Sequence, residues 1–185
     1  MMVLTHVAVG LALAVPVAVV APEFALATAV GGALGGFVPD LDLLWGQHRK
    51  TLHFPVLGVV PALVGIIGAA LAPGPLTVGA AVGGVAFLAH AASDALGAGE
   101  ELRPWERTNP DAVYDHVRGR WLRARYLVPY DGHPRDLGVA VAVATPVLVV
   151  YDGPVRWFTL TLLVVATAYT AVRKRVPKYV APLVE

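Results

Sequence analysis

The chain contains no cysteine and is poor in charge, with Asp, Glu, Lys and Arg making up 15% of its 185 residues. Without cysteine there are no disulfides, thiolate metal sites or cysteine nucleophiles, so any metal must be held by His, Asp or Glu. Soluble domains carry about 25% charged residues. The low charge is therefore the first indication that this is not an ordinary soluble domain.

Apolar residues take the place of the missing charge. They reach 57% of the chain, and the mean hydropathy is +0.66, which excludes intrinsic disorder. Glycine and proline are frequent, at 19 and 15 residues, but without the Gly-X-Y period of collagen. The composition indicates an integral membrane protein.

Six apolar runs follow one another along the chain. A helix needs about 17 to 25 residues to span about 30 Å of hydrocarbon, so the second and fifth runs are short. Turn residues at 21–23, 73–75 and 152–154 join the runs in pairs. We predict an all-α, polytopic membrane bundle of about six spans in three helical hairpins. The runs are residues 3–20, 24–38, 54–72, 76–96, 137–151 and 155–172.

The basic residues predict the orientation. Six spans place the N-terminus, residues 39–53, residues 97–136 and the C-terminal tail on one face, which then holds all but one of the 14 Lys and Arg residues. The other face has Arg156 alone. By the positive-inside rule we expect a multi-pass protein of the plasma or inner membrane with both termini cytoplasmic.

The chain is predicted to be one domain over residues 1–185. Residues 97–136 form a cytoplasmic insertion within it, expected to lie on the membrane surface. A helical periodicity brings Val113, Val117 and Trp121 to one side, but scattered arginines and Gly119 argue against a clean amphipathic helix.

The unusual polar side chains all fall near the predicted cytoplasmic ends of the spans. His90 and Asp94 are four residues apart, on one helix face, a spacing that suits two ligands of one ion. An Asp at the centre of a span costs about 2.5–3.5 kcal/mol on insertion scales, so it usually has a partner and a use. Four His and three Asp from four segments share this depth: His6, Asp40, Asp42, His48, His53, His90 and Asp94.

This set predicts a metal site with His6, Asp40, Asp42, His53, His90 and Asp94 as ligands. So much imidazole favours Zn, Mn or Fe, with zinc or manganese preferred over magnesium. We expect one or two ions, because two ions with bridging carboxylates would use all the ligands and activate water. His48 and Arg49 are the predicted catalytic residues: His48, or alternatively His53, as a general acid and Arg49 as a clamp for anionic charge.

Ordinary structural interpretations compete with these roles. His6 alone is typical of an interfacial histidine, residues 39–42 of a helix stop, and His90 with Asp94 of a hydrogen-bonded pair between helices. His116 and His133 are expected to be surface residues.

Four motifs, in their order, resemble those of the YdjM-like family, described as LexA-binding, inner-membrane-associated, metal-dependent hydrolases. The resemblance covers residues 1–95 and implies a metal-dependent hydrolase whose ligands lie in these motifs. Binding to LexA belongs to particular bacterial members and is not carried over. The motifs are Thr5-His6, Pro39-Asp40-Leu41-Asp42, His48-Arg49 with His53, and His90 to Asp94.

The chain departs from the family pattern around its second loop histidine. The family usually has Gly after His-Arg and Thr-His-Ser around the second His, where this chain has Lys50 and Leu52-His53-Phe54. The hydroxyls that would support that His are missing, although Thr51 is close. No motif after residue 96 matches the family.

The leading hypothesis is a membrane-embedded hydrolase acting at the cytoplasmic face on a phosphoester or ester of a lipid. A metal or proton transporter is the alternative, but the far halves of the predicted spans lack the ionisable groups that it needs. A haem protein using His6 and His90 leaves the aspartates unexplained. A non-catalytic scaffold recruited through the arginine-rich insertion is the fourth candidate.

The expected partners are membrane lipids and a lipid-like substrate, and no nucleic acid. The oligomeric state stays open. The glycine pairs Gly31-Gly32 and Gly35-Gly36 allow close helix contact, either within the bundle or between protomers.

Overall fold

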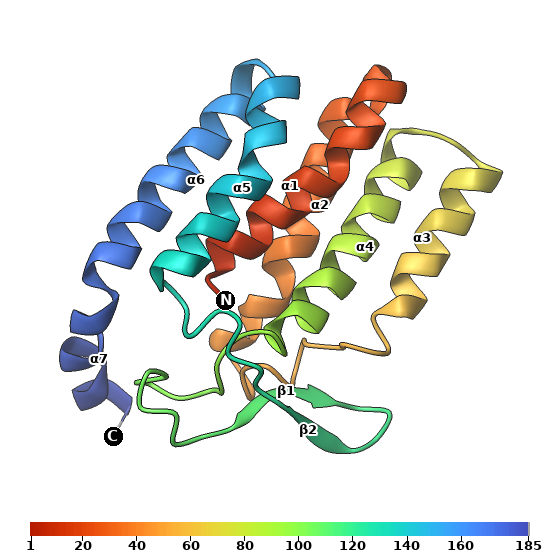
Figure 1. Cartoon of the computed structure of the whole chain (residues 1–185). Helices are drawn as coiled ribbons and strands as arrows, with labels where there is room; N and C mark the ends of the chain where they lie inside the picture. The colour runs from red at the N-terminus through yellow and green to blue at the C-terminus, as the bar shows by residue number, and fades with distance from the viewer. Residues whose placement is uncertain (185) are drawn as a thin grey trace.

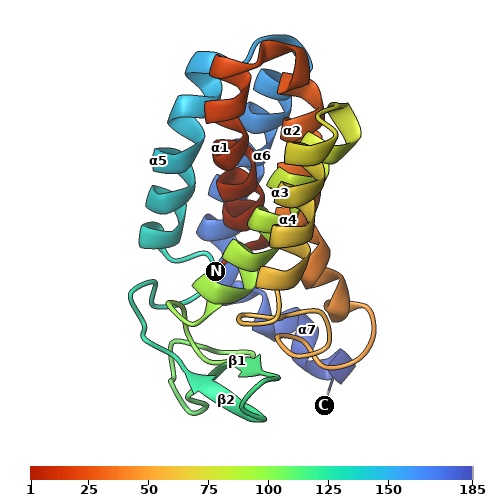
Figure 2. The same cartoon turned by 90° about the vertical axis from the view of Figure 1, so that its right-hand side faces the viewer.

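The computed structural model describes residues 1–184 as a helical bundle with one small sheet (Figure 1). Figures 1 and 2 show the β-hairpin and α7 at the end of the bundle where the N-terminus lies. The elements are α1 (Val3–Val20), η1 (Pro22–Phe24), α2 (Ala25–Phe37), η2 (Val38–Leu43), α3 (Val59–Leu71), α4 (Pro75–Asp94), β1 (Asp111–Asp115), β2 (Arg120–Arg123), α5 (Pro134–Val150), α6 (Gly153–Val172), η3 (Arg173–Arg175) and α7 (Pro177–Val184), where η marks a 3-10 helix.

Each of the six predicted apolar runs forms a helix, and consecutive helices pair as the three expected hairpins. The prediction of about six spans is not confirmed. Four helical segments of the described chain are long and apolar enough to cross a membrane, namely α1, the continuous segment Pro22–Leu43, α4 and the segment Gly153–Arg175. Large apolar side chains cover the outside of the bundle, as they do in membrane proteins.

The third and fifth runs give shorter helices, which are not among these four segments. The third run begins at residue 54, but the chain turns there, with Gly58 N–H donating to Phe54 O, and α3 has 13 residues. Pro61 then falls in the first turn of α3, where a missing N–H breaks no helical hydrogen bond. Helix α5 has 17 residues and carries Arg135 and Asp136 in its first turn.

Glycines on α2 allow it to touch α1 on one side and α4 on the other. A Cβ on Gly32 would lie 2.1 Å from the carbonyl oxygen of Gly10, and one on Gly31 would lie 2.0 Å from that of Gly79. One turn later, Gly36 meets the carbonyl oxygen of His6 in the same way. The glycine pairs of the sequence therefore serve contacts within the bundle.

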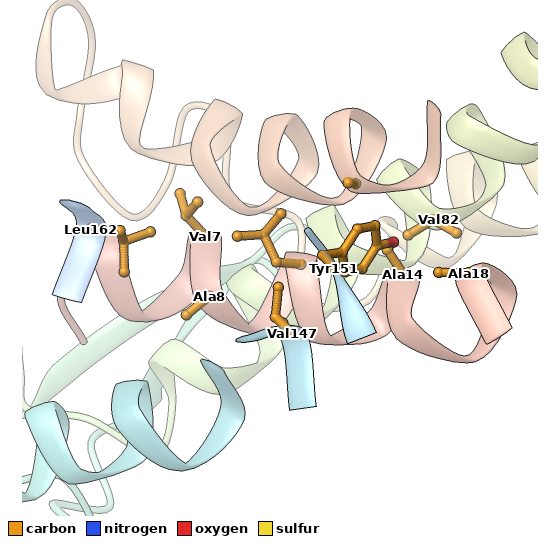
Figure 3. Packing of buried hydrophobic residues seen from close by; sticks show 10 residues of the cluster. Val7, Ala8, Ala14, Ala18, Val82, Val147, Tyr151 and Leu162 are labelled. Carbon is orange, nitrogen blue, oxygen red and sulfur yellow. The ribbon is translucent and has the colours of Figure 1, made fainter. Parts of the chain in front are cut away.

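The apolar core surrounds α1 (Figure 3). Ala8, Ala14 and Ala18 are buried on α1, and small side chains here let the neighbouring helices come close. Val147 and Tyr151 of α5, Leu162 of α6 and Val82 of α4 complete the cluster. The first run is therefore the central helix of the fold.

The insertion corrects the all-α prediction, because it contains an antiparallel hairpin, β1 with β2. Tyr114 and Trp121 are opposite each other, and their rings contact edge to face. Gly119 has a φ of 61° in the connecting turn, a conformation that glycine adopts without strain. Ala112 and Val113 are fully buried. The apolar spacing therefore marks strands, since the turn at Gly119 cannot be part of a helix.

The close approach of α2 and α4 predicts the effect of a single methyl group. Gly31→Ala should lower the free energy of unfolding by about 2 kcal/mol, because its Cβ would meet a backbone carbonyl that cannot move without separating the helices. Gly68→Ala is the matched control on α3: no heavy atom lies within 4 Å of its Cβ, and helix propensity should stabilise it by about 1 kcal/mol at most. Denaturation in detergent micelles measures both. Equal stabilities would contradict this packing.

Candidate metal centre

Four separate segments bring the predicted His and Asp residues together at one end of the bundle. His6 comes from the first turn of α1, Asp40 and Asp42 from η2, His48 and His53 from the following loop, and His90 and Asp94 from the end of α4. Five of these side chains are buried, while Asp40 and His48 are half-buried. The structure therefore brings the seven side chains together at one end of the bundle.

The centre of the cluster is a ring of two imidazoles and two carboxylates. His53 Nε2 lies 3.2 Å from Asp94 Oδ2 and 3.7 Å from Asp40 Oδ1. His90 Nε2 lies 3.4 Å from Asp40 Oδ1 and 3.6 Å from Asp94 Oδ2. Each nitrogen therefore faces the same two carboxylates.

The opposite ring nitrogens are fixed by acceptors. His90 Nδ1 donates to the carbonyl of Gly36 at 2.8 Å, and His53 Nδ1 donates to Asp42 Oδ2 at 2.9 Å. Carbonyls and carboxylates accept only, so in the neutral imidazoles the proton is on Nδ1 and Nε2 carries a lone pair. Both Nε2 atoms are buried and have no hydrogen-bond partner among the described residues. A lone pair and a carboxylate repel each other, so this arrangement is stabilised by a cation between them, either a proton or a metal ion.

The backbone supplies the carbonyl that orients His90. Pro39 has no N–H to continue the α-helical hydrogen bonds of α2, and the chain tightens into the 3-10 helix η2. The close packing at Gly36 brings its carbonyl against the end of α4, within reach of His90. The tight backbone therefore fixes the imidazole.

His6 extends the cluster on one side. Its Nε2 lies 3.1 Å from Asp94 Oδ1, and its ring stacks on His90 with 3.7 Å between centroids. His6, His90 and Asp94 each offer a ligand atom, and these atoms lie within 4.8 Å of one another. This is one group able to hold a metal ion.

His48 extends the cluster on the other side. Asp40, His48 and His53 form a second group whose ligand atoms also lie within 4.8 Å of one another. The structure thus brings His48, predicted as an acid, among candidate ligands. About a fifth of its side chain is exposed (20%), so this side of the cluster is the open one.

Asp42, predicted as a ligand, lies behind the two loop histidines. Its Oδ1 accepts from His48 Nδ1 at 2.7 Å, and its Oδ2 accepts from His53 Nδ1 and from the backbone N–H of Leu52. A carboxylate in this place fixes the tautomer and the orientation of an imidazole ligand. Asp42 therefore acts as a positioning residue for His48 and His53.

The carboxylates dominate the charge at the centre. Burial opposes protonation of His53, but the carboxylates of Asp40, Asp42 and Asp94 beside it outweigh burial and raise the pKa of this imidazole to about 10. Without a metal ion, a proton on Nε2 therefore takes the place that the lone pair would offer to the ion. The same field of negative charge attracts a divalent cation.

The separations between the ligand atoms are suitable for holding a metal ion. Ligand atoms on tetrahedral zinc, at 2.0–2.1 Å from the ion, lie about 3.3 Å apart. The N···O separations in the cluster run from 3.1 to 3.7 Å. Imidazole with carboxylate suits zinc and manganese, and the described donor set contains no soft ligand.

Arg49, predicted as an anion clamp, holds the insertion. Its buried guanidinium donates from Nη1 to the carbonyls of Ala98 and Ala112, at 2.6 and 3.3 Å. Its backbone carbonyl accepts from Tyr114 N–H of β1, and its φ of 59° turns the chain toward this contact. Arg49 thus connects the ligand loop to the hairpin.

A pocket of about 330 Å³, here named the polar pocket for the charged side chains that line it together with apolar ones, opens beside Asp40 and His48, with Arg49 in its wall. Glu100 of the insertion lines it too, and burial raises the pKa of this carboxyl. The motif analysis missed Glu100, because no sequence signal places it next to residues fifty positions earlier.

Two further carboxylates were missed, half-buried Asp131 and buried Asp136, and both are structural. Asp131 pairs with Arg173 at the end of α6, at 2.7 Å. Asp136 accepts hydrogen bonds from the backbone of Met2 and from Thr5. The position of Asp136 in the first turn of α5 was a signal that could have been used, since acidic residues favour helix N-termini.

Comparisons with models of protein families, with curated proteins and with solved structures find no match to this chain.

Arg49→Met should loosen the insertion while keeping the side chain's length. It leaves two buried carbonyls without their donor, at a cost of about 1–3 kcal/mol each. We expect faster cleavage within residues 97–136 in limited digestion with chymotrypsin. Arg103→Met is the control, because the exposed Arg103 pairs with Glu106 alone in the described part of the chain. Equal digestion of the two variants would exclude the tethering role.

Proposed function

We propose that this protein is a membrane-embedded, metal-dependent hydrolase of lipid phosphoesters or esters. The observation that carries the proposal is the pair of buried Nε2 atoms, on His53 and His90, that face two carboxylates and have no hydrogen-bond partner in residues 1–184. The resemblance of the four motifs to the YdjM-like family supports the same activity.

Two ions, zinc or manganese, are the proposed cofactor. One is assigned to His6, His90 and Asp94, and the other to Asp40, His48 and His53. The two groups meet where His53 lies 3.2 Å from Asp94 and His90 lies 3.4 Å from Asp40. Such proximity suits carboxylates that bridge two ions, as in two-metal hydrolytic sites.

The proposed hydrolysis takes place in the polar pocket, beside Asp40 and His48. Bound metal would activate water and neutralise charge that develops on the group under attack. Asp42 holds His48 and His53 in position for it. Glu100, whose raised pKa favours the protonated carboxyl, is the proposed proton donor for the leaving group.

The charge pattern supports a site at the cytoplasmic face. Residues 97–136 and the stretch from Arg173 to Lys178 carry most of the basic residues, and the β-hairpin and α7 lie at the same end of the bundle as the metal centre (Figure 1). The positive-inside rule then directs this end to the cytoplasm, with both termini. A lipid headgroup at that interface is the proposed substrate.

The same distribution argues against transport. In the part of the chain that the structure describes, every buried charged residue or histidine belongs to the end with the metal centre or its insertion. A relay across the membrane needs such groups along its length. The direct stacking of His6 on His90 likewise leaves no space for a haem between them.

Elemental analysis of detergent-purified protein tests the metal centre. We expect about two equivalents of zinc or manganese in the wild type, and loss of metal in Asp40→Asn. His48→Ala, at the half-exposed edge, should lose one ion while keeping the fold. Asp152→Asn is the matched control, since Asp152 is exposed in the distant α5–α6 turn. A wild type that takes up no metal after reloading would overturn the proposal.

Hydrolysis by the metal-loaded protein tests the reaction. Phosphatidic acid in mixed micelles should release phosphate in a metal-dependent way, and Glu100→Gln should lower kcat by about 10²-fold and remove the alkaline limb of the pH profile. Glu106→Gln, on an exposed part of the insertion, should leave the rate unchanged. If the protein binds metal but hydrolyses neither phosphoester nor ester lipids, the proposed hydrolase activity is contradicted.

A further inference from the structure

A second hollow, larger than the polar pocket, lies on the outside of the bundle. It is an open groove of about 850 Å³ on α4, between α2 and α3. All of its lining residues are Gly, Ala, Pro, Val, Leu or Phe. Val30, Leu34 and Val64 line it with at least half of their surfaces exposed.

Small residues on α4 create the groove. Gly79 and Gly83 face the backbone of α2, whereas Gly84 faces Pro61 and Ala62 of α3. The two neighbouring helices are thus held close to α4 on either side, as Figure 1 shows. Ala80 is exposed between them and forms the floor of the groove, where its small side chain leaves space.

The dimensions of the groove suit a hydrocarbon chain. It extends from Pro75 to Phe87, about 18 Å at 1.5 Å per residue, close to the thickness of one leaflet, about 15 Å. Its volume over that length gives a cross-section of about 47 Å². Carbon atoms in contact lie about 4 Å apart, so one or two alkyl chains fit.

One end of the groove adjoins the metal centre. Phe87 is three residues before His90 on α4, about 4.5 Å along the axis, and its ring stacks on Phe54, next to His53. Val38 lines the groove from η2, and Asp40 of the same 3-10 helix lines the polar pocket. The apolar groove and the polar pocket therefore share η2.

We propose that this groove binds a hydrocarbon chain of a membrane lipid, with the headgroup end of that chain at Phe87 and the metal centre. The inference rests on the proposed function in one respect, that this lipid is the substrate. Binding in the groove is separate from hydrolysis and has its own measurement. Within the bilayer, the preference for the groove comes from van der Waals packing of the chain against the groove walls, with no polar partner required.

Photocrosslinking tests the occupant directly. The probe is phosphatidic acid with a diazirine in its palmitoyl chain, in phosphatidylcholine vesicles with the full-length protein. We expect labels on the groove residues of α2 and α4 about tenfold above those on the exposed face of α6. Ala80→Phe, which fills the floor, should remove this excess. Ala142→Phe, at an exposed alanine of α5 outside the groove, should not.

The outcomes separate the groove from the enzyme. Groove labelling that persists in Asp40→Asn supports chain binding even where hydrolysis is lost. If the enzyme is active, Ala80→Phe should slow hydrolysis of long-chain phosphatidic acid about tenfold and leave the soluble p-nitrophenyl phosphate unaffected. Uniform labelling of all exposed helices would overturn the proposal. Since the chain has no cysteine, a disulfide-linked dimer of Ala80→Cys would instead identify a second copy as the occupant.

Discussion

The close contact of α2 with both α1 and α4 is the constraint on which the rest of the structure depends. Gly32 and Gly36 let α2 approach the backbone of α1, and Gly31 and Gly35 let it approach that of α4. In a membrane, where apolar side chains gain little by leaving lipid, such backbone proximity is the main source of helix association. The same proximity places the Gly36 carbonyl against His90 and brings η2 to the end of α4, so helix packing and metal centre share one cause.

Most polar groups of the buried His and Asp cluster are paired with one another. Asp42 uses both oxygens on two histidines and a backbone N–H, and Asp94 lies between His6, His53 and His90. Outside this cluster, Nη1 of Arg49 donates to two carbonyls of the insertion, whereas its buried Nε has no partner among the described residues. Isolated charges of this kind would be costly to bury. Within the cluster, the buried side-chain atoms left without a hydrogen-bond partner in residues 1–184 are the two Nε2 atoms at the centre, which is where the proposed ions belong.

The polar pocket and the apolar groove would bind different parts of an amphipathic molecule, its headgroup and its hydrocarbon chain. The polar pocket is bounded by Asp40, His48 and Glu100, and the groove is apolar throughout. Because η2 borders both, a lipid with its headgroup at the metal centre and a chain along α4 would contact each with the matching part. The insertion, held by Arg49 and by the Asp131–Arg173 pair, forms the wall of the pocket that faces away from the helices.

The sequence by itself determined the hairpins, the membrane character of the helices and the gathering of His and Asp residues at one end. Apolar periodicity, turn chemistry and hydropathy act over short stretches, and the up-and-down path of the chain then fixes which ends meet. The prediction of about six spans is not confirmed, since a run of apolar residues such as 54–72 does not show that the chain turns at residues 54–58 before α3 begins. The hairpin was missed as well, because it depends on the positive φ at Gly119.

The tertiary structure alone decided the roles within the cluster. His48 joins the candidate ligands, Asp42 lies behind them, and Arg49 ties down the insertion, although all three come from one short stretch of the chain. Glu100 and the groove on α4 likewise result from contacts between distant segments. Spacing along a chain tells which residues come near one another. The direction in which each ring nitrogen or carboxylate oxygen points depends on the partners that other helices supply.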